Sequence, residues 1–166
     1  MITFRALELS DVDVLYQIEN EESVWQYSNT NAPYSRFALE QFVLSSAHDF
    51  YQDGQLRLVA ECEGRCAGIV DLFNYDPHHL RAEVGIYIMP EFRGKGFGAE
   101  ALRQLISYTE RHLQLHQLVA FVAVQNNAAI QCFEHAGFVQ SGVLKDWIAL
   151  RPGIFSDVSV FQCVVR

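Results

Sequence analysis

The sequence predicts a single α/β (α+β) domain with a central mixed, mostly antiparallel sheet of about seven strands and four helices. Two patterns carry this prediction. Apolar residues alternate in short segments bounded by turn residues, which is typical of half-buried strands. In longer segments they recur every three or four positions, which is typical of helices packed on a sheet. No linker or repeat divides the chain, so we expect one domain over residues 1–166.

The first half of the chain is expected to alternate between strand and helix. Residues 2–7 alternate as a strand, and Ser10 is placed to cap the helix that follows. A polar loop over residues 28–35 leads to a second helix, whose end we place near Asp53-Gly54. Three strands come next, over residues 56–61, 67–73 and 81–89.

A glycine cluster opens the second half. The helix after it runs to about Leu113, and Gly137 ends a shorter helix in the position where glycine supplies a left-handed cap. The remaining elements are a strand over 118–124, the short helix over 126–135 and two final strands over 142–149 and 156–165.

Charge and composition exclude several classes of protein. The formal net charge of −8 argues against a nucleic-acid partner, because phosphate binding needs clustered Lys and Arg. It suits a cationic acceptor, although an acidic balance is also a common route to solubility. No apolar run approaches the roughly 20 residues that cross a bilayer, so we expect no membrane partner. With no secretory leader and too few cysteines for a disulfide scaffold, a cytoplasmic location is expected.

Three glycines at alternate positions, Gly94, Gly96 and Gly98, stand where a turn enters a helix. Without side chains, the backbone N–H groups there can approach an anion, and the helix dipole adds about half a positive charge at the same end. Arg93 and Lys95 flank the turn and are placed to contact phosphate oxygens. The alternative is a tight turn that only packs the helix on the sheet. The G-x-G-x-G spacing fits neither a Rossmann nor a P-loop site.

Two segments resemble signatures of the GNAT acetyltransferase family. Arg93-Gly94-Lys95-Gly96-Phe97-Gly98 is similar to the R/Q-x-x-G-x-G/A motif that holds the coenzyme A pyrophosphate. The segment from Asn126 to Phe138 resembles N-x-x-A-I-x-x-Y-x-x-x-G-F, with one extra residue at its start. The resemblance covers nearly the whole chain and is closest to the spermidine and ribosomal-protein N-acetyltransferase types.

The resemblance implies a splayed pair of parallel strands, with acetyl-CoA as the cosubstrate and its pantetheine arm lying between the strands like an added strand. The backbone N–H of Ile88 would polarise the thioester carbonyl and stabilise the oxyanion. The cofactor-binding residues that the resemblance implies are Ile86, Tyr87, Ile88, Arg93, Gly94, Lys95, Gly96, Phe97, Gly98, Asn126 and Phe133.

Two carboxylates, Glu83 and Asp71, are the candidate catalytic groups. An acceptor amine with a pKa near 10 must lose a proton before it attacks, and each carboxylate stands on an otherwise apolar strand. Either could instead be an outward solvated residue or the salt-bridge partner of Arg81. Asp71 resembles a strand glutamate of the spermidine acetyltransferases, but the loop over residues 29–34 lacks the paired glutamates those enzymes carry.

The second motif departs from the family at one position. A tyrosine usually stands there to protonate the departing thiolate, and this chain has Phe133. A thiol with a reference pKa of about 8.5 can leave as its anion, and water or Tyr87 is an alternative donor. Cys132 has no recognisable activating partner, so helix packing is its simpler explanation than an acyl-enzyme.

The sequence therefore predicts an acetyl-CoA-dependent N-acetyltransferase that acts by direct attack of a primary amine, on a polyamine-like molecule or a protein N-terminus. The competing hypothesis is a non-catalytic acyl-CoA-binding or regulatory module on the same fold. No metal is implied, because the adjacent His78 and His79 lack further ligands. A homodimer is one explanation for the aromatic residues of the last strands, and core packing is the other. These aromatic residues are Trp147, Phe155 and Phe161.

Overall fold

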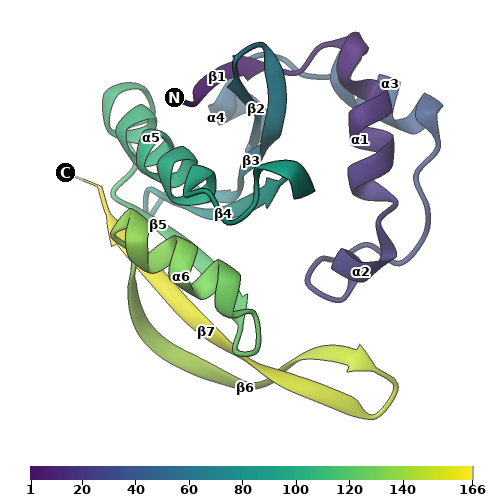
Figure 1. The fold of residues 1–166 in the computed structure, drawn as a ribbon. Helices are drawn as coiled ribbons and strands as arrows, with labels where there is room; N and C mark the ends of the chain where they lie inside the picture. Colours follow the sequence, from purple (N-terminus) through teal and green to yellow (C-terminus); the bar gives the residue numbers. More distant parts are fainter. Residues whose placement is uncertain (166) are drawn as a thin grey trace.

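The computed structural model describes residues 1–165, which form one seven-stranded sheet with helices packed on it (Figure 1). The strands are β1 (Thr3–Ala6), β2 (Leu56–Cys62), β3 (Arg65–Asp76), β4 (Arg81–Ile88), β5 (Gln117–Ala123), β6 (Val139–Arg151) and β7 (Ile154–Val164). The α-helices are α1 (Val12–Glu19), α2 (Glu22–Trp25), α3 (Arg36–Leu44), α4 (Phe50–Asp53), α5 (Phe97–His112) and α6 (Asn127–Ala136). Two 3-10 turns cover Leu9–Asp11 and Pro90–Phe92.

The strand order is β1-β2-β3-β4-β5-β7-β6, and every neighbouring pair is antiparallel except β4 and β5. This confirms the predicted mixed, mostly antiparallel sheet. The parallel pair is short: Arg81–Glu83 of β4 pair with Gln117–Val119 of β5, and the rest of β4 has no partner on that side. The two strands therefore separate after Glu83, as a splayed pair should.

Helix boundaries differ from the prediction in the first third of the chain. The second helix ends at Leu44, well before the predicted end near Asp53, and α4 forms separately. The Asp53 carboxylate accepts hydrogen bonds from the Ala47 N–H and the Ser46 hydroxyl, which folds the intervening loop back on α4. Nor does Ser10 cap α1: the N-cap residue is Asp11, whose side chain makes no capping bond to α1. The buried Asp11 carboxylate instead pairs with Arg5 and accepts the Glu8 N–H at 2.8 Å, across the 3-10 turn before α1.

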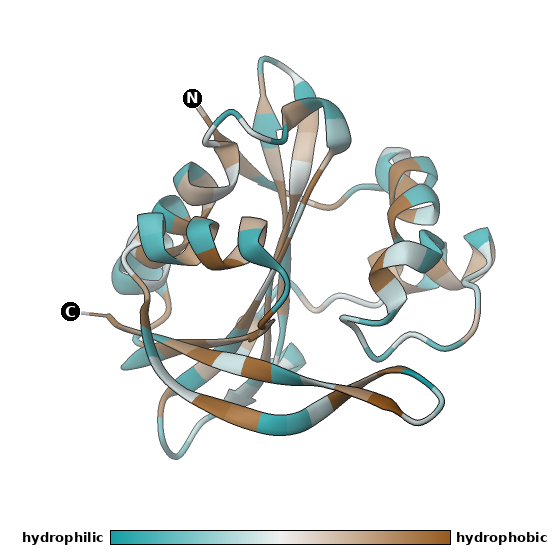
Figure 2. Ribbon diagram, turned by 60° about the horizontal axis from the view of Figure 1, so that its bottom comes forward, coloured by the Kyte–Doolittle hydropathy of each residue, from teal (hydrophilic) through white to brown (hydrophobic). Residues whose placement is uncertain are grey.

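The last two strands are longer than predicted and form a hairpin that extends from the body of the sheet (Figure 2). Its turn is Pro152-Gly153, where Gly153 adopts a φ of 77°, a conformation that glycine enters without steric cost. The aromatic residues of the hairpin divide in two. Phe161 is fully buried and belongs to the core, whereas Trp147 and Phe155 are 58% and 55% exposed.

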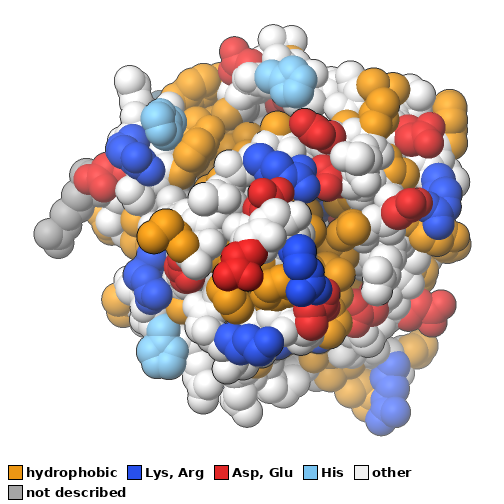
Figure 3. All heavy atoms as spheres, turned by 45° about the horizontal axis from the view of Figure 1, so that its top comes forward, with side chains coloured by type: hydrophobic (Ala, Val, Ile, Leu, Met, Phe, Trp, Pro, Cys, Tyr) orange, Lys and Arg blue, Asp and Glu red, His pale blue; other side chains and the backbone are white. Residues whose placement is uncertain are grey.

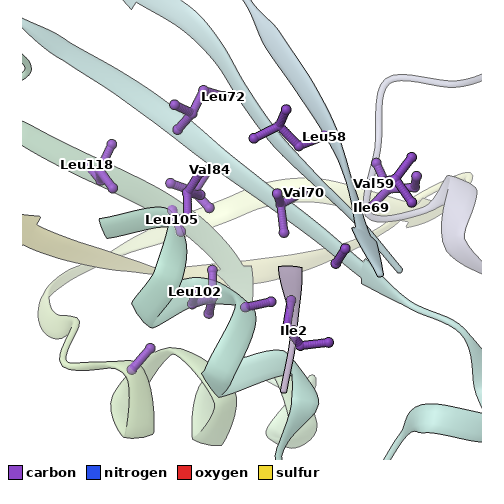
Figure 4. Packing of buried hydrophobic residues seen from close by; sticks show 14 of the residues in the cluster. Ile2, Leu58, Val59, Ile69, Val70, Leu72, Val84, Leu102, Leu105 and Leu118 are labelled. Carbon is purple, nitrogen blue, oxygen red and sulfur yellow. The ribbon is translucent and has the colours of Figure 1, made fainter. Parts of the chain in front are cut away.

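The side chains of β4 alternate between the two faces of the sheet, and one of these faces packs against α5. Val84 packs against Leu102 and Leu105 of α5 in the main core (Figure 4), and even-numbered positions share that face because side chains alternate along a strand. Glu83, Gly85 and Tyr87 consequently lie on the opposite face of the sheet. Among the described residues, no helix is long and apolar enough to cross a membrane.

Gly98 packs α5 against α6, which leads to a stability prediction. A Cβ at this position would lie 2.6 Å from Cys132 Sγ and 3.5 Å from Ile88 Cγ1. We expect Gly98→Ala to lower the free energy of unfolding by about 1–3 kcal/mol, the usual cost of overpacking. Urea denaturation measures the change.

The control is the double variant with Cys132→Ala, which removes the obstructing sulfur atom. Part of the loss should then be recovered. Equal stability of Gly98→Ala and the parent would contradict this account of the helix contact.

Candidate active site

The gap between β4 and β5 exposes the backbone of alternate β4 residues. Met89 donates its N–H to the Ala67 carbonyl at 2.8 Å, so odd-numbered residues bond to β3 in this antiparallel pair. The N–H and C=O groups of Ile86 and Ile88 therefore point the other way, into the gap. Tyr87 was also expected to offer its backbone to the pantetheine arm, but its carbonyl faces Gly68 of β3.

The three glycines of the turn differ in backbone geometry and in their surroundings. Gly94 and Gly96 have φ values of 70° and 81°, which L side chains rarely adopt, and no protein atom lies within 4 Å of a Cβ built on either. Gly96 is the N-cap of α5 and carries no side chain to cap it. The N–H groups of the first turn of α5 are thus open to an anion. Gly98, predicted to serve the same purpose, instead makes room for Cys132.

The two basic side chains of the turn donate hydrogen bonds to backbone carbonyls. Arg93 Nε donates to the Ile88 carbonyl at 2.8 Å, and its guanidinium lies 5.2 Å from the centre of the Tyr87 ring. Lys95 Nζ donates to the Glu91 carbonyl at 2.7 Å. Both side chains are exposed and lie beside the open end of α5, within reach of a phosphate group bound there.

The remaining predicted cofactor residues are less accessible. Asn126 Oδ1 accepts the Ala129 N–H at 3.2 Å and caps α6, which leaves its amide nitrogen for a ligand. Phe97 packs edge-on against Phe92. Phe133 is 3% exposed and lies beside Phe138 and Phe161, so its ring is held in the core.

Asp71 lies on the face of the sheet opposite α5 and is held by an ion-pair triad. Its two carboxylate oxygens accept hydrogen bonds from Arg57 at 2.6 and 3.1 Å, and Arg57 also contacts Glu19 at 2.5 Å. Burial raises the pKa of Asp71, and the Arg57 guanidinium opposes that shift. With both oxygens engaged, Asp71 is a poorer proton acceptor than its position on the strand suggested.

Glu83 shares this face and accepts fewer hydrogen bonds than Asp71. Its carboxylate accepts one hydrogen bond, from the Asn74 amide at 3.0 Å. Pairing with Arg81, one of the alternatives that the sequence left open, does not occur, because Arg81 binds Asp76 at 3.1 Å. Glu83 also stands where β4 leaves β5, at the start of the gap. Of the two predicted catalytic carboxylates, Glu83 has the carboxylate with fewer hydrogen-bond donors.

Glu21 contacts Tyr87 of the candidate site, a contact that the sequence did not reveal. Its carboxylate accepts hydrogen bonds from the Tyr87 hydroxyl and from the Ser23 hydroxyl. The bond from Tyr87 lowers the pKa of Glu21, while burial and the same contact raise the pKa of Tyr87 to about 12. At neutral pH the pair is a carboxylate bound by a neutral phenol. The partners are 66 positions apart, so no local pattern connects them.

A cavity of about 340 Å³ lies between residues 25–31 and residues 147–149 of β6. The indoles of Trp25 and Trp147 line it together with polar side chains of the loop. Trp25 is fixed by a hydrogen bond from its indole N–H to the Glu19 carbonyl at 2.9 Å. A larger cavity of about 810 Å³ lies at the edge of the sheet near α3 and α4, and Asp71, Glu83 and the glycine turn do not line it.

Charge is mixed over the face of the molecule in Figure 3, where acidic and basic side chains alternate around apolar ones. Within residues 1–165, no three His, Cys, Asp or Glu side chains gather in a way that could hold a metal ion.

Comparison with known proteins gives these features a context. The acetyltransferase (GNAT) domain family matches residues 1–139. Spermidine N(1)-acetyltransferase of Vibrio cholerae is 31% identical over 159 residues, which cover 95% of this chain and 89% of that protein. The Escherichia coli K12 enzyme of the same name is 33% identical over 86% of this chain and 75% of its own length. The putative ribosomal N-acetyltransferase YdaF of Bacillus subtilis is 28% identical over 99% and 92%.

Solved structures agree with the sequence matches. The crystal structure of the V. cholerae spermidine N-acetyltransferase in complex with CoA and spermine has a TM-score of 0.87 to this chain, at 28% identity, covering 99% of this chain and 95% of that one. A dodecameric form of the V. cholerae protein has a TM-score of 0.80 at 30% identity, covering 98% and 93%.

The open end of α5 gives a prediction about acetyl-CoA binding. In Gly96→Val, the added side chain projects into the space where the turn would meet pyrophosphate. We expect the dissociation constant for acetyl-CoA to rise tenfold or more, or about 1.4 kcal/mol, as measured by calorimetry.

Gly54→Val is the matched control, because Gly54 also has a left-handed φ, of 66°, with no protein atom within 4 Å, but ends α4. It carries similar backbone strain and should leave acetyl-CoA binding unchanged. If a folded Gly96→Val protein binds as tightly as the parent, the turn does not hold the pyrophosphate.

Proposed function

The chain belongs to the GNAT acetyltransferase family, and from that premise we propose that it transfers the acetyl group of acetyl-CoA to a primary amine of a small, cationic, polyamine-like molecule. Membership makes the chain an acetyl-CoA-dependent N-acetyltransferase. The acceptor, the catalytic residues and the state of assembly are our proposals. The observation that carries the choice of acceptor is the acidic face of β3 and β4.

The residues that would hold acetyl-CoA surround the gap after Glu83. Gly94 and Gly96 leave the first turn of α5 open for the pyrophosphate, and Arg93 and Lys95 stand beside it. The backbone groups of Ile86 and Ile88 have no β5 partner and would accept the pantetheine arm as an added strand. The Ile88 N–H would then donate to the carbonyl oxygen of the thioester, where negative charge develops as the amine attacks.

The acceptor side carries three carboxylates on or beside one face of the sheet, Asp71, Glu83 and Glu21. Arg57 compensates the first, which leaves Glu21 and Glu83 to attract an ammonium group. The cavity between Trp25 and Trp147 offers aromatic faces to a second cationic end, and cations bind such faces favourably. This arrangement suits an elongated acceptor with two amines. The relatives named for spermidine support the same class, although the loop over residues 29–34 lacks paired glutamates here.

Proton transfer is proposed to run through Glu83. An ammonium group must become an amine before it attacks the thioester carbon, and Glu83 has a carboxylate oxygen that no cation neutralises. On the leaving-group side, Phe133 is buried and has no proton to give, and the Tyr87 hydroxyl is bonded to Glu21. The thiol therefore departs as its anion, which a reference pKa of about 8.5 permits.

Direct attack is favoured over an acyl-enzyme. Cys132 is the cysteine nearest the glycine turn, and burial raises the pKa of its thiol to about 11. A thiol of that pKa is almost wholly protonated at neutral pH and a weak nucleophile.

We also propose that copies of the chain associate, through the exposed Trp147 and Phe155 of the β6–β7 hairpin, as a homodimer or a larger assembly.

The proposed acceptor class can be tested by free-thiol release. The parent protein with acetyl-CoA should acetylate diamines and polyamines, and mass spectrometry of the products should show acetyl groups on primary amines. Peptides with free N-termini form the second arm of the panel. A protein that binds acetyl-CoA but turns over neither class would be an acyl-CoA-binding module, and the proposed function would be wrong.

The proposed base can be tested with Glu83→Gln, which keeps the carbonyl oxygen that Asn74 binds but cannot accept a proton. We expect turnover to fall by about 10²–10⁴, the usual contribution of a general base, with acetyl-CoA affinity unchanged. Rates should be followed across pH.

Asp71→Asn is the comparison, because it loosens the triad with Arg57. It should reduce stability, since it removes one charge of a largely buried pair. Parental rates in Glu83→Gln at every pH would exclude Glu83 as the proton acceptor.

A further inference from the structure

The gap between β4 and β5 is less obstructed on one face of the sheet than on the other. On the α5 side, Val84, Leu102 and Leu105 are each at most 6% exposed and fill the space against the strands (Figure 4). The other face carries the odd-numbered residues of β4. An amine that approaches the thioester position from this face therefore passes beside the row formed by Glu83, Gly85 and Tyr87.

Gly85 is the one position of that row without a side chain, and its neighbours are fixed. Glu83 is hydrogen-bonded to Asn74 and Tyr87 to Glu21, and these two side chains flank the position of Gly85 along the strand. A Cβ built on Gly85 would lie 3.4 Å from Phe73 Cε1 and 3.5 and 3.7 Å from Asp71 Cβ and Oδ2. The vacant volume is therefore bounded by an aromatic ring and a carboxylate, and Gly85 itself is only half-buried.

The fold does not require glycine at this position. Gly94 and Gly96 need a left-handed φ, Gly68 would collide with the Tyr87 carbonyl at 2.2 Å, and Gly98 would collide with Cys132. Gly85 has none of these constraints, and glycine weakens the interior of a strand. A residue that is locally unfavourable and structurally unnecessary, at the entrance to a reaction site, points to a role in substrate access.

We propose that Gly85 is a specificity-determining residue that admits the carbon bearing the acceptor's amine, an inference that rests on the proposed function. The Phe73 ring and the aliphatic part of Asp71 contact this carbon, and the carboxylates of Asp71 and Glu83 face the nitrogen. The vacant volume is about that of one methyl or methylene group. The site thus selects primary amines on unbranched chains and disfavours amines whose carbon carries a further substituent, as in most peptide N-termini.

A matched pair of acceptors tests the selection. 1,4-Diaminobutane and 2,5-diaminohexane have the same spacing and charge, and the second carries a methyl group on each amine-bearing carbon. The parent should show a kcat/KM at least tenfold higher for 1,4-diaminobutane. Equal values for the two diamines would overturn the inference.

Gly85→Ala tests the residue itself. The added methyl makes ordinary van der Waals contacts, so the variant should fold and bind acetyl-CoA as the parent does, with kcat/KM for 1,4-diaminobutane at least tenfold lower. Gly142→Ala is the control, because Gly142 also lies in a strand without a left-handed φ and has no protein atom within 4 Å of a built Cβ. It should keep parental kinetics.

The outcomes separate this inference from the proposed function. Parental kcat/KM in Gly85→Ala would overturn the role of Gly85 and leave acetyl transfer to amines standing. Loss of acetyl-CoA binding by Gly85→Ala would make Gly85 structural and would also overturn it. A parent that acetylates neither diamine contradicts both proposals, because the proposed acceptor is itself polyamine-like.

Discussion

The separation of β4 from β5 is the constraint on which the site depends. Three residue pairs join the parallel strands at Arg81–Glu83, and beyond them β4 and β5 form no backbone hydrogen bonds with each other. Backbone polar groups without a partner cost about 1–3 kcal/mol each when they are removed from water, so the backbone of Ile86 and the N–H of Ile88 favour any extended chain that can pair with them. The fold thus creates a binding site where the β4–β5 hydrogen bonds stop, and a pantetheine arm has amide groups that can bond to the free backbone groups of β4.

Glycine marks the site for several different physical reasons, and a sequence pattern does not distinguish them. Gly94 and Gly96 turn the backbone, Gly98 lets α5 approach Cys132, and Gly85 leaves a gap on the acceptor face. The alternate spacing in the turn suggested one purpose for three residues. Backbone angle and nearest atoms assign two of them to the open helix end and the third to helix packing, and they draw attention to a fourth that no motif includes.

Local regularity explains which features the sequence predicted. Strand alternation, the turn before α5 and the cap at Gly137 are short-range properties, and they located the strands of the sheet and the helix that follows the glycine turn. The splayed pair was expected from the resemblance to the GNAT family and not from a local pattern. The second helix was extended beyond Leu44 because its apolar spacing continues, whereas the Asp53 carboxylate draws the loop back on itself. The contacts of Arg57 and Glu21 join residues 38 and 66 positions away, and only the folded chain brings such pairs together.

These long-range contacts join the two halves of the site at Tyr87. Its backbone completes the β3–β4 ladder, its ring lies beneath the Arg93 guanidinium, and its hydroxyl binds Glu21 just before α2. Arg93 in turn bonds the Ile88 carbonyl that faces the gap. The turn that would hold pyrophosphate, the strand that would hold the thioester and the acidic loop on the acceptor side therefore share one residue. Because a phenol with a pKa of about 12 stays protonated throughout the neutral range, this connection persists at every pH at which an amine acceptor could be acetylated.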